Sequence, residues 1–313
     1  LKETGQAQVS TSDPDSRQMI VRNNITEVAY NAQTKVDAKH NILIDYKVTN
    51  NNDSKAMGTM LRRAKTILKT NSFTALYDKG YHTGSEFEIA NTLGIETMVA
   101  IPTVAANSPN KDYNVENFGY CRQSDFYTCP QGHKLTTNGR IHQAKTYLFK
   151  RYVTKACKTC PVKPECSKAI YGKAIQRSQF QTLIDDNKKR INANKNLYRK
   201  RQQIVEHPYG TLKRQWGFSF VATKKTMERA SADIGFMMSA YNLRRIINIV
   251  GIKTLKDWLE RSTLSIRHII QLCKPKTDHL INQLWERIIR PEIIIKHLNC
   301  LYLTKKTITK GGF

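Results

Sequence analysis

The chain has 313 residues, of which 40% are hydrophobic, so it can bury a core and is not a wholly disordered protein. Its 51 Lys and Arg against 25 Asp and Glu give a formal net charge of +26, which favours a polyanionic partner. No apolar run is long enough to cross a membrane, and no signal-peptide core or amphipathic anchor is found. The chain begins without Met, which favours a fragment or a processed product.

A polar loop is predicted first, at residues 10–15. Its Asp13-Pro14-Asp15 sequence offers two carboxylates that could bind a metal ion. The same sequence is more typical of turn chemistry, in which Asp side chains bond to nearby backbone amides. The structural role is therefore the favoured interpretation.

The first regular element is predicted to be a β-hairpin over residues 28–49. Residues 28–36 favour a strand and residues 37–41 favour a turn. Apolar and polar residues then alternate from Ile42 to Thr49, and this period of two is typical of a half-buried strand.

The next segment predicts a helix, a strand, a second helix and a second strand, over residues 54–69, 73–77, 84–93 and 97–101. Together with the hairpin, this order predicts an α/β (α+β) fold with a mixed sheet. Asp78 directly follows the strand at 73–77. Because α/β folds place ligands and metals just past the carboxyl ends of central strands, Asp78 is a candidate site residue.

Cysteines dominate the stretch that follows a polar connection at residues 103–125. Four of them stand in two short motifs, Cys129-Pro-Gln-Gly-His133 and Cys157-x2-Cys160-x5-Cys166. Four soft ligands from two turns suit tetrahedral Zn²⁺, with His133 or Cys121 as possible replacements for one thiol. The alternative is a set of reduced cysteines whose turns persist without metal.

A strongly basic helical region is predicted over residues 178–214. Between Asn187 and Lys225 there are eleven Lys or Arg and one carboxylate, Glu206. Such a carboxylate is well placed to hold a divalent metal against a phosphodiester whose backbone the cations neutralise. Arg199 and Lys213 lie seven residues to either side of Glu206, so a helix places all three near one face, with a kink expected at Pro208 and Gly210. The alternative is a solvated basic helix.

An aromatic patch and further helices complete the chain. Trp216, Phe218 and Phe220 favour core packing over stacking on bases. A largely buried helix is predicted over residues 225–249, followed by two or three helices in the tail at 252–313. The tail's two cysteines, Cys273 and Cys300, are expected to be packing or surface thiols.

Several of these motifs resemble one family in combination, the DDE transposases of bacterial insertion sequences. Asp78-Lys-Gly-Tyr81 resembles the D-x-G-Y element at the second catalytic Asp, and Val205-Glu206-His-Pro-Tyr-Gly-Thr-Leu-Lys213 resembles the element that carries the catalytic Glu. Tyr241-Asn242-Leu243 resembles the closing A-Y-N-L segment, and the cysteine motifs resemble those of one subgroup. The resemblance covers about residues 10–250.

The resemblance implies an RNase H-like fold in which three carboxylates hold two Mg²⁺ (or Mn²⁺) ions for DNA cleavage and strand transfer. Asp78 and Glu206 would be two of the three. The family's Y-x2-R-x3-E-x6-K signature matches Tyr198, Arg201 and Lys213, although four residues separate Arg201 from Glu206, so Arg199 is a substitute. These side chains and Arg214 would bind double-stranded DNA, namely the element's terminal inverted repeats and the target. The active enzyme would be a homo-oligomer in the bacterial cytoplasm, associated with the nucleoid.

One departure from the family concerns the first catalytic Asp, which usually stands in D-G-T on the first strand. The chain has no D-G-T, and Asp37 and Asp45 lie on the predicted hairpin. The sequence is therefore interpreted as a transposase without its N-terminal portion, and this chain alone is expected to be inactive. The alternatives are a catalytically inactive, zinc-containing DNA-binding protein derived from a transposase, and an RNase H-like nuclease.

The expected domains follow from this interpretation. Residues 1–102 would form the first part of the core, without its first strand, and 103–176 a cysteine-rich insertion with a possible zinc site. Residues 177–250 would complete the core with the Glu206 helix, and 251–313 would form a helical tail.

Overall fold

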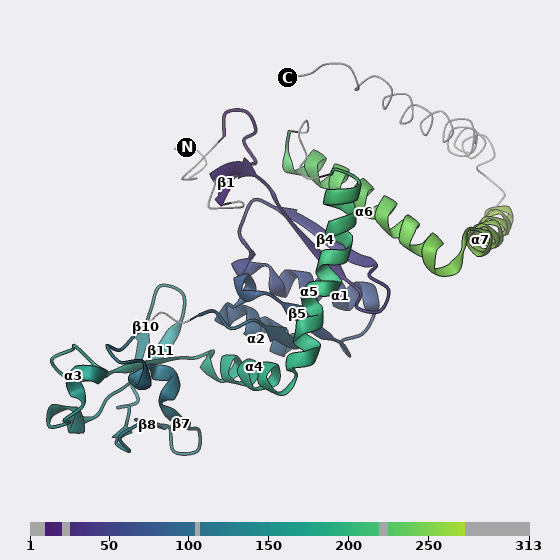
Figure 1. Ribbon diagram of the computed structural model, residues 1–313. Coiled ribbons are helices and arrows are strands. Elements are labelled where there is room, and N and C mark those ends of the chain that lie inside the picture. The colour runs from purple at the N-terminus through teal and green to yellow at the C-terminus, as the bar shows by residue number, and fades with distance from the viewer. Residues whose placement is uncertain (1–9, 21–25, 104–106, 219–224, 273–313) are drawn as a thin grey trace. The chain divides into compact units, whose positions relative to one another are not determined.

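The computed structural model describes residues 10–20, 26–103, 107–218 and 225–272 of the chain (Figure 1). The chain forms two compact units, Leu1–Arg245 and Ile246–Phe313. The strands and the candidate site residues described below belong to the first unit. The predicted α/β (α+β) class is confirmed, and the strands form several small sheets.

The predicted hairpin is formed by β3 (Asn31–Val36) and β4 (Leu43–Thr49), which pair antiparallel with Asn31 opposite Thr49. Residues 28 and 29, expected to open the hairpin, belong instead to β2 (Thr26–Ala29), which pairs with β1 (Arg17–Ile20). The chain passes from one ladder to the other at Tyr30. The hydroxyl of Tyr30 donates to Asp13 at 2.7 Å, which fixes this junction to the polar loop.

A parallel strand pair forms the second layer of the core. β5 (Thr74–Tyr77) lies beside β6 (Glu96–Val99), and α2 (Gly84–Leu93) makes the crossover between them. α1 (Met57–Leu68) packs against α2 because its apolar residues recur at helical spacing. The two helices and β6 share a buried cluster that consists of Met57, Leu61, Phe87, Ala90, Ile95 and Val99.

Two asparagines on helices pair with strand backbone in the same way. The side-chain amide of Asn187 accepts a bond from Val99 N at 2.8 Å and donates to Val99 O at 2.9 Å. Asn242 makes the same pair of bonds with Leu43, both at 2.8 Å. Asn187 is fully buried, so water cannot satisfy the N–H and C=O groups of Val99. The asparagine amide makes the two hydrogen bonds that a neighbouring strand would otherwise make.

Residues 107–180 form a separate region of short strands, here called the cysteine-rich module. β7 (Gly119–Cys121), β8 (Phe126–Thr128) and β9 (Lys134–Leu135) make one antiparallel sheet. β10 (Ile141–Gln143), β11 (Leu148–Tyr152) and β12 (Ile175–Ser178) make another. Its buried residues are Phe118, Tyr127, Leu135, Tyr152 and Ile175.

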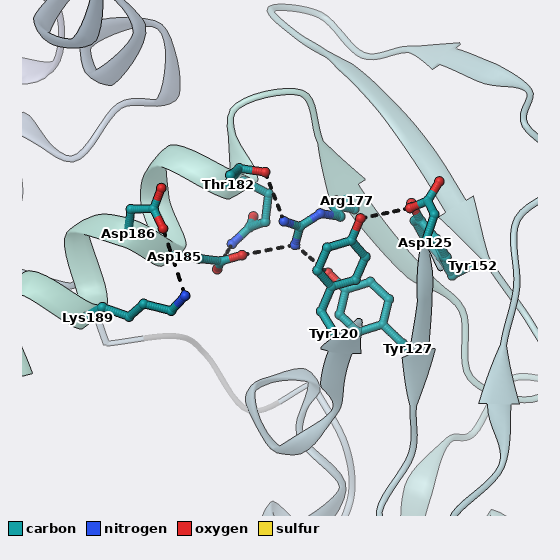
Figure 2. A network of polar contacts seen from close by, with 10 residues as sticks. Tyr120, Asp125, Tyr127, Tyr152, Arg177, Thr182, Asp185, Asp186 and Lys189 are labelled. Carbon is teal, nitrogen blue, oxygen red and sulfur yellow. Dashed lines mark hydrogen bonds and ion pairs between the residues drawn. The ribbon is translucent and has the colours of Figure 1, made fainter. Parts of the chain in front are cut away.

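Arg177 joins this module to the helix that follows it (Figure 2). Its guanidinium lies 3.6 Å from the Tyr120 ring centroid and donates to the Tyr127 hydroxyl at 3.0 Å. It also donates to Asp185 at 3.0 Å and Thr182 at 3.2 Å, both in α4 (Gln181–Ala193). One buried cation therefore holds an aromatic pair of the module and the start of α4 together.

The basic region predicted at 178–214 consists of two helices and a π-helix. α4 ends at Ala193, the backbone of Asn194 is not helical, and α5 (Lys195–Tyr209) begins directly after it. Pro208 lies inside α5, and the π-helix Gly210–Gln215 follows. The irregularity predicted at Pro208 and Gly210 is therefore a change from α to π hydrogen bonding.

α6 (Met227–Val250) closes the first unit's remaining core. Its buried side chains meet the hairpin and the π-helix in a cluster of Leu43, Val48, Leu212, Ile234, Met238 and Tyr241. Trp216 and Phe218 pack against this cluster, so their predicted core role is confirmed. Phe220 lies outside the described residues.

In the second unit, α7 (Ile252–Leu272) follows Gly251, which has a left-handed backbone at φ +83°. This helix is the first of those predicted for the tail. The rest of the tail, with Cys273 and Cys300, lies outside the described residues. In the part of the chain that the structure describes, no helix combines the length and the apolar character needed to cross a membrane.

Candidate functional site

Asp78 directly follows β5, as the sequence predicted. Its backbone is extended, and its carboxylate accepts a bond from Gly80 N at 2.9 Å, which caps the short 3₁₀ helix Lys79–Tyr81. The carboxylate is thus held at the carboxyl end of the strand, where α/β folds place ligands.

Asp53 occupies the same corner, and sequence reasoning did not select it. A Cβ atom on Gly80 would lie 3.2 Å from Asp78 Oδ1 and 3.3 Å from Asp53 Oδ2, so the two carboxylates border the same glycine. Asn31 and Gln33 of β3 donate to Asp53 Oδ1 at 2.6 and 3.1 Å. These bonds tie the corner to the hairpin and leave Oδ2 directed at Gly80.

α5 runs from the end of β5 to the hairpin. The Tyr198 hydroxyl donates to Tyr77 O at 2.8 Å, and the Tyr209 hydroxyl shares a bond with Thr34 of β3 at 2.9 Å. The two tyrosines are eleven residues apart, about three turns, so they lie on one face of the helix. Glu206 stands one turn before Tyr209 on this bridging helix.

The negative charges of Asp53 and Asp78 raise the pKa values of nearby tyrosines, two of which lie on α5. Burial raises the pKa of Tyr198, and the negative charge of Asp78 adds to the rise. Burial likewise raises the pKa of Tyr209, with a further contribution from Asp53. Burial raises the pKa of Tyr81 far above its usual value, and Asp53 and Asp78 both contribute. Asp78 thus lies nearer the Tyr198 end of α5, and Asp53 lies nearer the Tyr209 end.

Glu206 itself is exposed, and its carboxylate accepts a bond from Gln202 at 2.8 Å. Among the described residues, no three His, Cys, Asp or Glu side chains are grouped closely enough to hold one metal ion. The shared metal site predicted for Asp78 and Glu206 therefore stays a prediction.

The four cysteines selected from the sequence lie around one pocket of the module, but they are not grouped closely enough to hold one metal ion as they stand. Cys129, Cys157, Cys160 and Cys166 line one pocket, and His133 lines it too. Burial raises the pKa of Cys166, Lys173 opposes the rise, and the other three thiols add to it. Cys121 lies on β7 and does not line this pocket, and the five described cysteines form no disulfide.

Comparison with known proteins adds one finding. Residues 128–247 match a family described as a transposase DDE domain. This part of the chain, somewhat more than a third of it, is similar to the DDE transposases. No curated protein and no solved structure matches the chain.

The family match covers the four pocket cysteines, α4, α5 with Glu206, and most of α6, and it begins after Asp78. The match supports a transposase-type function. The role of Asp78 rests on the sequence motif and on its place beside α5.

The Tyr241-Asn242 motif has a structural role. Besides the bonds of Asn242 to Leu43, the Tyr241 hydroxyl donates to Asn41 O at 2.8 Å and lies 2.8 Å from His207 Nδ1. Arg245, one turn on, donates to His40 O at 2.7 Å. The motif fastens α6 to the hairpin turn and to the helix that carries Glu206.

The other acidic candidates are engaged elsewhere. Asp37 caps the hairpin turn through His40 N at 2.6 Å, and Asp45 is paired with Arg63 of α1. Asp13 and Asp15 accept bonds from Thr226 N and Met227 N at the start of α6. The structural role favoured for the Asp-Pro-Asp sequence is therefore what these contacts show.

The basic side chains of α5 and the π-helix differ in their surroundings. Arg199 and Lys200 are exposed, whereas the Arg201 guanidinium lies 5.8 Å from the Tyr198 ring centroid. Lys213 Nζ lies 5.2 Å from the Tyr209 ring centroid, and Arg214 is exposed. The two tyrosines that join α5 to the core thus also orient two of the family's signature cations.

Proposed function

We propose that this protein is a transposase that takes part in metal-dependent DNA cleavage and strand transfer of an insertion sequence. The observation that carries the proposal is the bond from Tyr198 to Tyr77, which joins the Glu206 helix to the strand end that bears Asp78. The family match to residues 128–247 supports the same reaction class.

In this proposal Asp78 and Glu206 bind the catalytic metal, and Asp53 is an additional ligand. Carboxylate oxygens are the donors that Mg²⁺ and Mn²⁺ prefer, and Asp53 Oδ2 and Asp78 Oδ1 already border the same glycine. When bound, such ions activate water or a 3′-hydroxyl and stabilise the charge that develops on the phosphate. Asn31 and Gln33 would keep Asp53 oriented by their bonds to its other oxygen.

Double-stranded DNA is the proposed partner, with terminal inverted repeats and target DNA bound by a homo-oligomer. Exposed cations of α4, α5 and the π-helix would neutralise its phosphates. Orientation of Arg201 and Lys213 over tyrosine rings favours a fixed register on the backbone. The proposed DNA-binding residues are Tyr198, Arg199, Arg201, Lys213 and Arg214.

We also propose that the cysteine pocket binds a structural Zn²⁺ ion. Four thiols and one imidazole line a single pocket, and these are the donor types that Zn²⁺ takes in closed structural sites. Purified protein is expected to contain about one zinc per chain. Cys160→Ser should lower this content, whereas Cys121→Ser should not, and a protein with no zinc and four freely titrating thiols would refute the site.

Metal binding at the acidic corner can be measured without catalysis. Mn²⁺ binding, followed by electron paramagnetic resonance, should weaken in Asp53→Asn, Asp78→Asn and Glu206→Gln but not in Glu88→Gln, an exposed control on α2. We expect a loss of more than about tenfold, because even outer-shell partners of metal ligands contribute 10- to 100-fold. Unchanged binding in all three variants would remove these residues from the metal site.

The reaction is tested with Mg²⁺ and paired terminal-repeat DNA, for this chain and for a version extended upstream through a D-G-T strand. Strand transfer that is lost in Asp78→Asn and Glu206→Gln supports the proposal, whereas cleavage without joining identifies a nuclease. The same assay tests the expectation that this chain alone is inactive. Cleavage by this chain that Asp53→Asn abolishes would make Asp53 the third carboxylate.

DNA binding is tested through its salt dependence. Each lost phosphate contact should lower the slope of log affinity against log salt by about 0.9 on duplex DNA. The double variant Lys213→Ala/Arg214→Ala is expected to lower both affinity and slope. Unchanged values would show that these cations form only a solvated face.

A further inference from the structure

Two large apolar side chains project from a tight turn of the cysteine-rich module. Gly172 N donates to Ala169 O at 3.0 Å, which closes a four-residue turn with Ile170 and Tyr171 at its two corners. Ile170 is 81% exposed and Tyr171 is 79% exposed. Exposed turns normally carry Gly, Pro, Asn, Asp or Ser at such positions, so an aliphatic and an aromatic residue there call for an explanation.

The turn is held from three sides. Lys163 Nζ donates to Ile170 O at 2.7 Å, and Ala169 N donates to the Ser167 hydroxyl at 3.2 Å. Gly172 has a left-handed backbone at φ +89°, and a Cβ atom on it would lie 2.2 Å from Cys157 Cβ. Only glycine fits this contact, which seats the turn against the cysteine pocket. The two apolar side chains are thus presented by a fixed backbone.

The surroundings of the turn are cationic. Residues 155–173 contain five lysines and one acid, Glu165, whose carboxylate accepts a bond from Asn110. Lys155, Lys158 and Lys168 are exposed. A partner that accepts both lysines and a projecting apolar pair must offer negative charge beside flat apolar surfaces. DNA offers both, in its phosphates and its base faces.

We propose that Ile170 and Tyr171 form a wedge that enters DNA at an unstacked base step, with the Tyr171 ring stacked on an exposed base. Apolar side chains of DNA-bending proteins insert between base steps in this way, and aromatic rings stack on bases without regard to sequence. The choice of DNA as partner rests on the proposed function. The wedge lies outside the residues proposed to bind metal, so it would position or distort DNA.

Binding to duplexes with and without one unpaired base tests the wedge. Because an unpaired base costs less to unstack, the wild-type chain should prefer the duplex that contains it. Tyr171→Ala should bind this duplex at least about fivefold more weakly, the lower end for one base–aromatic stack, and should lose the preference. Tyr171→Phe should retain it because the ring remains, and Ile170→Ser should weaken it.

Two readouts separate stacking from other effects. A 2-aminopurine placed at the unpaired position should be quenched by the wild type and by Tyr171→Phe, but not by Tyr171→Ala. The salt slope should stay unchanged in Tyr171→Ala, since no phosphate contact is lost. Phe236→Ala is the matched control, because Phe236 on α6 is 75% exposed and should leave both readouts unaltered. Melting temperatures should not differ, since the replaced side chains are exposed.

The outcomes distinguish the wedge from the proposed function. A wild type that binds DNA as tightly as Tyr171→Ala, with equal quenching, would overturn the wedge and leave the transposase proposal standing. A wild type that binds no DNA would overturn both. If the substitutions changed only the oligomeric state, measured by light scattering, the turn would be a contact between copies of the chain and the wedge would be wrong.

Discussion

The cysteine-rich module and the β5–β6 layer are stabilised by different kinds of buried side chain. The β5–β6 layer buries aliphatic and methionine side chains between two helices, and Met57, Leu61 and Val99 are completely enclosed. The module encloses tyrosines, which bring hydroxyls into its interior and require polar partners. Arg177 and Asp125 supply those partners. The contrast teaches that a region of short strands with little aliphatic core depends on a few charged side chains.

The largest expected effect is the loss of the charge at the centre of the module. Arg177→Met removes the bonds to Tyr127, Asp185 and Thr182 and leaves the Asp185 carboxylate without its buried cation. Because the Asp185 side chain is 38% exposed, most of the loss comes from the unpaired Tyr127 hydroxyl and the vacated face of the Tyr120 ring, and the total is about 3–5 kcal/mol. Urea unfolding should show this loss, while Arg151→Met, at an exposed position of β11, should change the free energy of unfolding little. An Arg177→Met protein as stable as the wild type would show that apolar packing alone holds the module.

The matching change in the β5–β6 layer is Leu61→Ala. Leu61 is fully buried between α1 and α2, so its truncation leaves a cavity that costs about 2–5 kcal/mol. Thermal unfolding at several pH values should show the same loss at each, because no titratable group is involved. Ile67→Ala, on the same helix but 49% exposed, is the control. A loss that varied with pH would contradict the apolar account of this layer.

Asp125 sharpens the comparison through its pH dependence. Lys150, Tyr152 and Tyr120 donate to its carboxylate and lower its pKa from 3.8 to about 2. The carboxylate therefore adds stability above its unfolded pKa of 3.8, and this contribution is lost as the pH falls through about 2. Asp125→Asn should cost about 1–3 kcal/mol at pH 7, and the deficit should shrink towards pH 2. An equal deficit at pH 7 and pH 2 would contradict the charged role.

Lys35 on β3 should give the smallest effect, with a pH dependence in the basic range. Its amine is buried without a hydrogen-bond partner among the described residues, and burial lowers its pKa from 10.5 to about 8. Between these values the unfolded state binds more protons, so stability rises as the pH increases from 8 to 10.5. Lys35→Met should abolish this rise and add about 1 kcal/mol at pH 7. Lys47→Met on β4 is the control, and a rise that persisted in Lys35→Met would assign it to another group.

The elements predicted well from the sequence were those with a local signal. The alternation after Ile42 predicted β4, and the helix expected over residues 84–93 agrees with α2. The place of Asp78 followed from the end of an apolar run before a glycine turn. Each of these depends on neighbouring residues only, so a single sequence contains the information.

The residues that escaped prediction depend on partners far along the chain. Asp53 directly precedes the predicted helix at 54–69, and its place beside Asp78 requires the hairpin and β5 to meet. Asn187 is 88 residues from Val99, and no periodic pattern marks an amide that pairs with a strand. Arg177 stood among many cations, with nothing local to show that it alone would be buried between tyrosines. Charge and spacing selected the right region but not these roles.

The side-chain amides of Asn187 and Asn242 prevent further strands from pairing with the two core sheets at the edges that they cover. A strand edge ordinarily invites another strand, from the same chain or from a neighbour. At Val99 and Leu43 the donor and the acceptor are both already taken by a side chain that cannot extend the ladder. Each helix thus prevents a further strand from pairing at the residue that its asparagine covers, whether that strand comes from the same chain or from another copy.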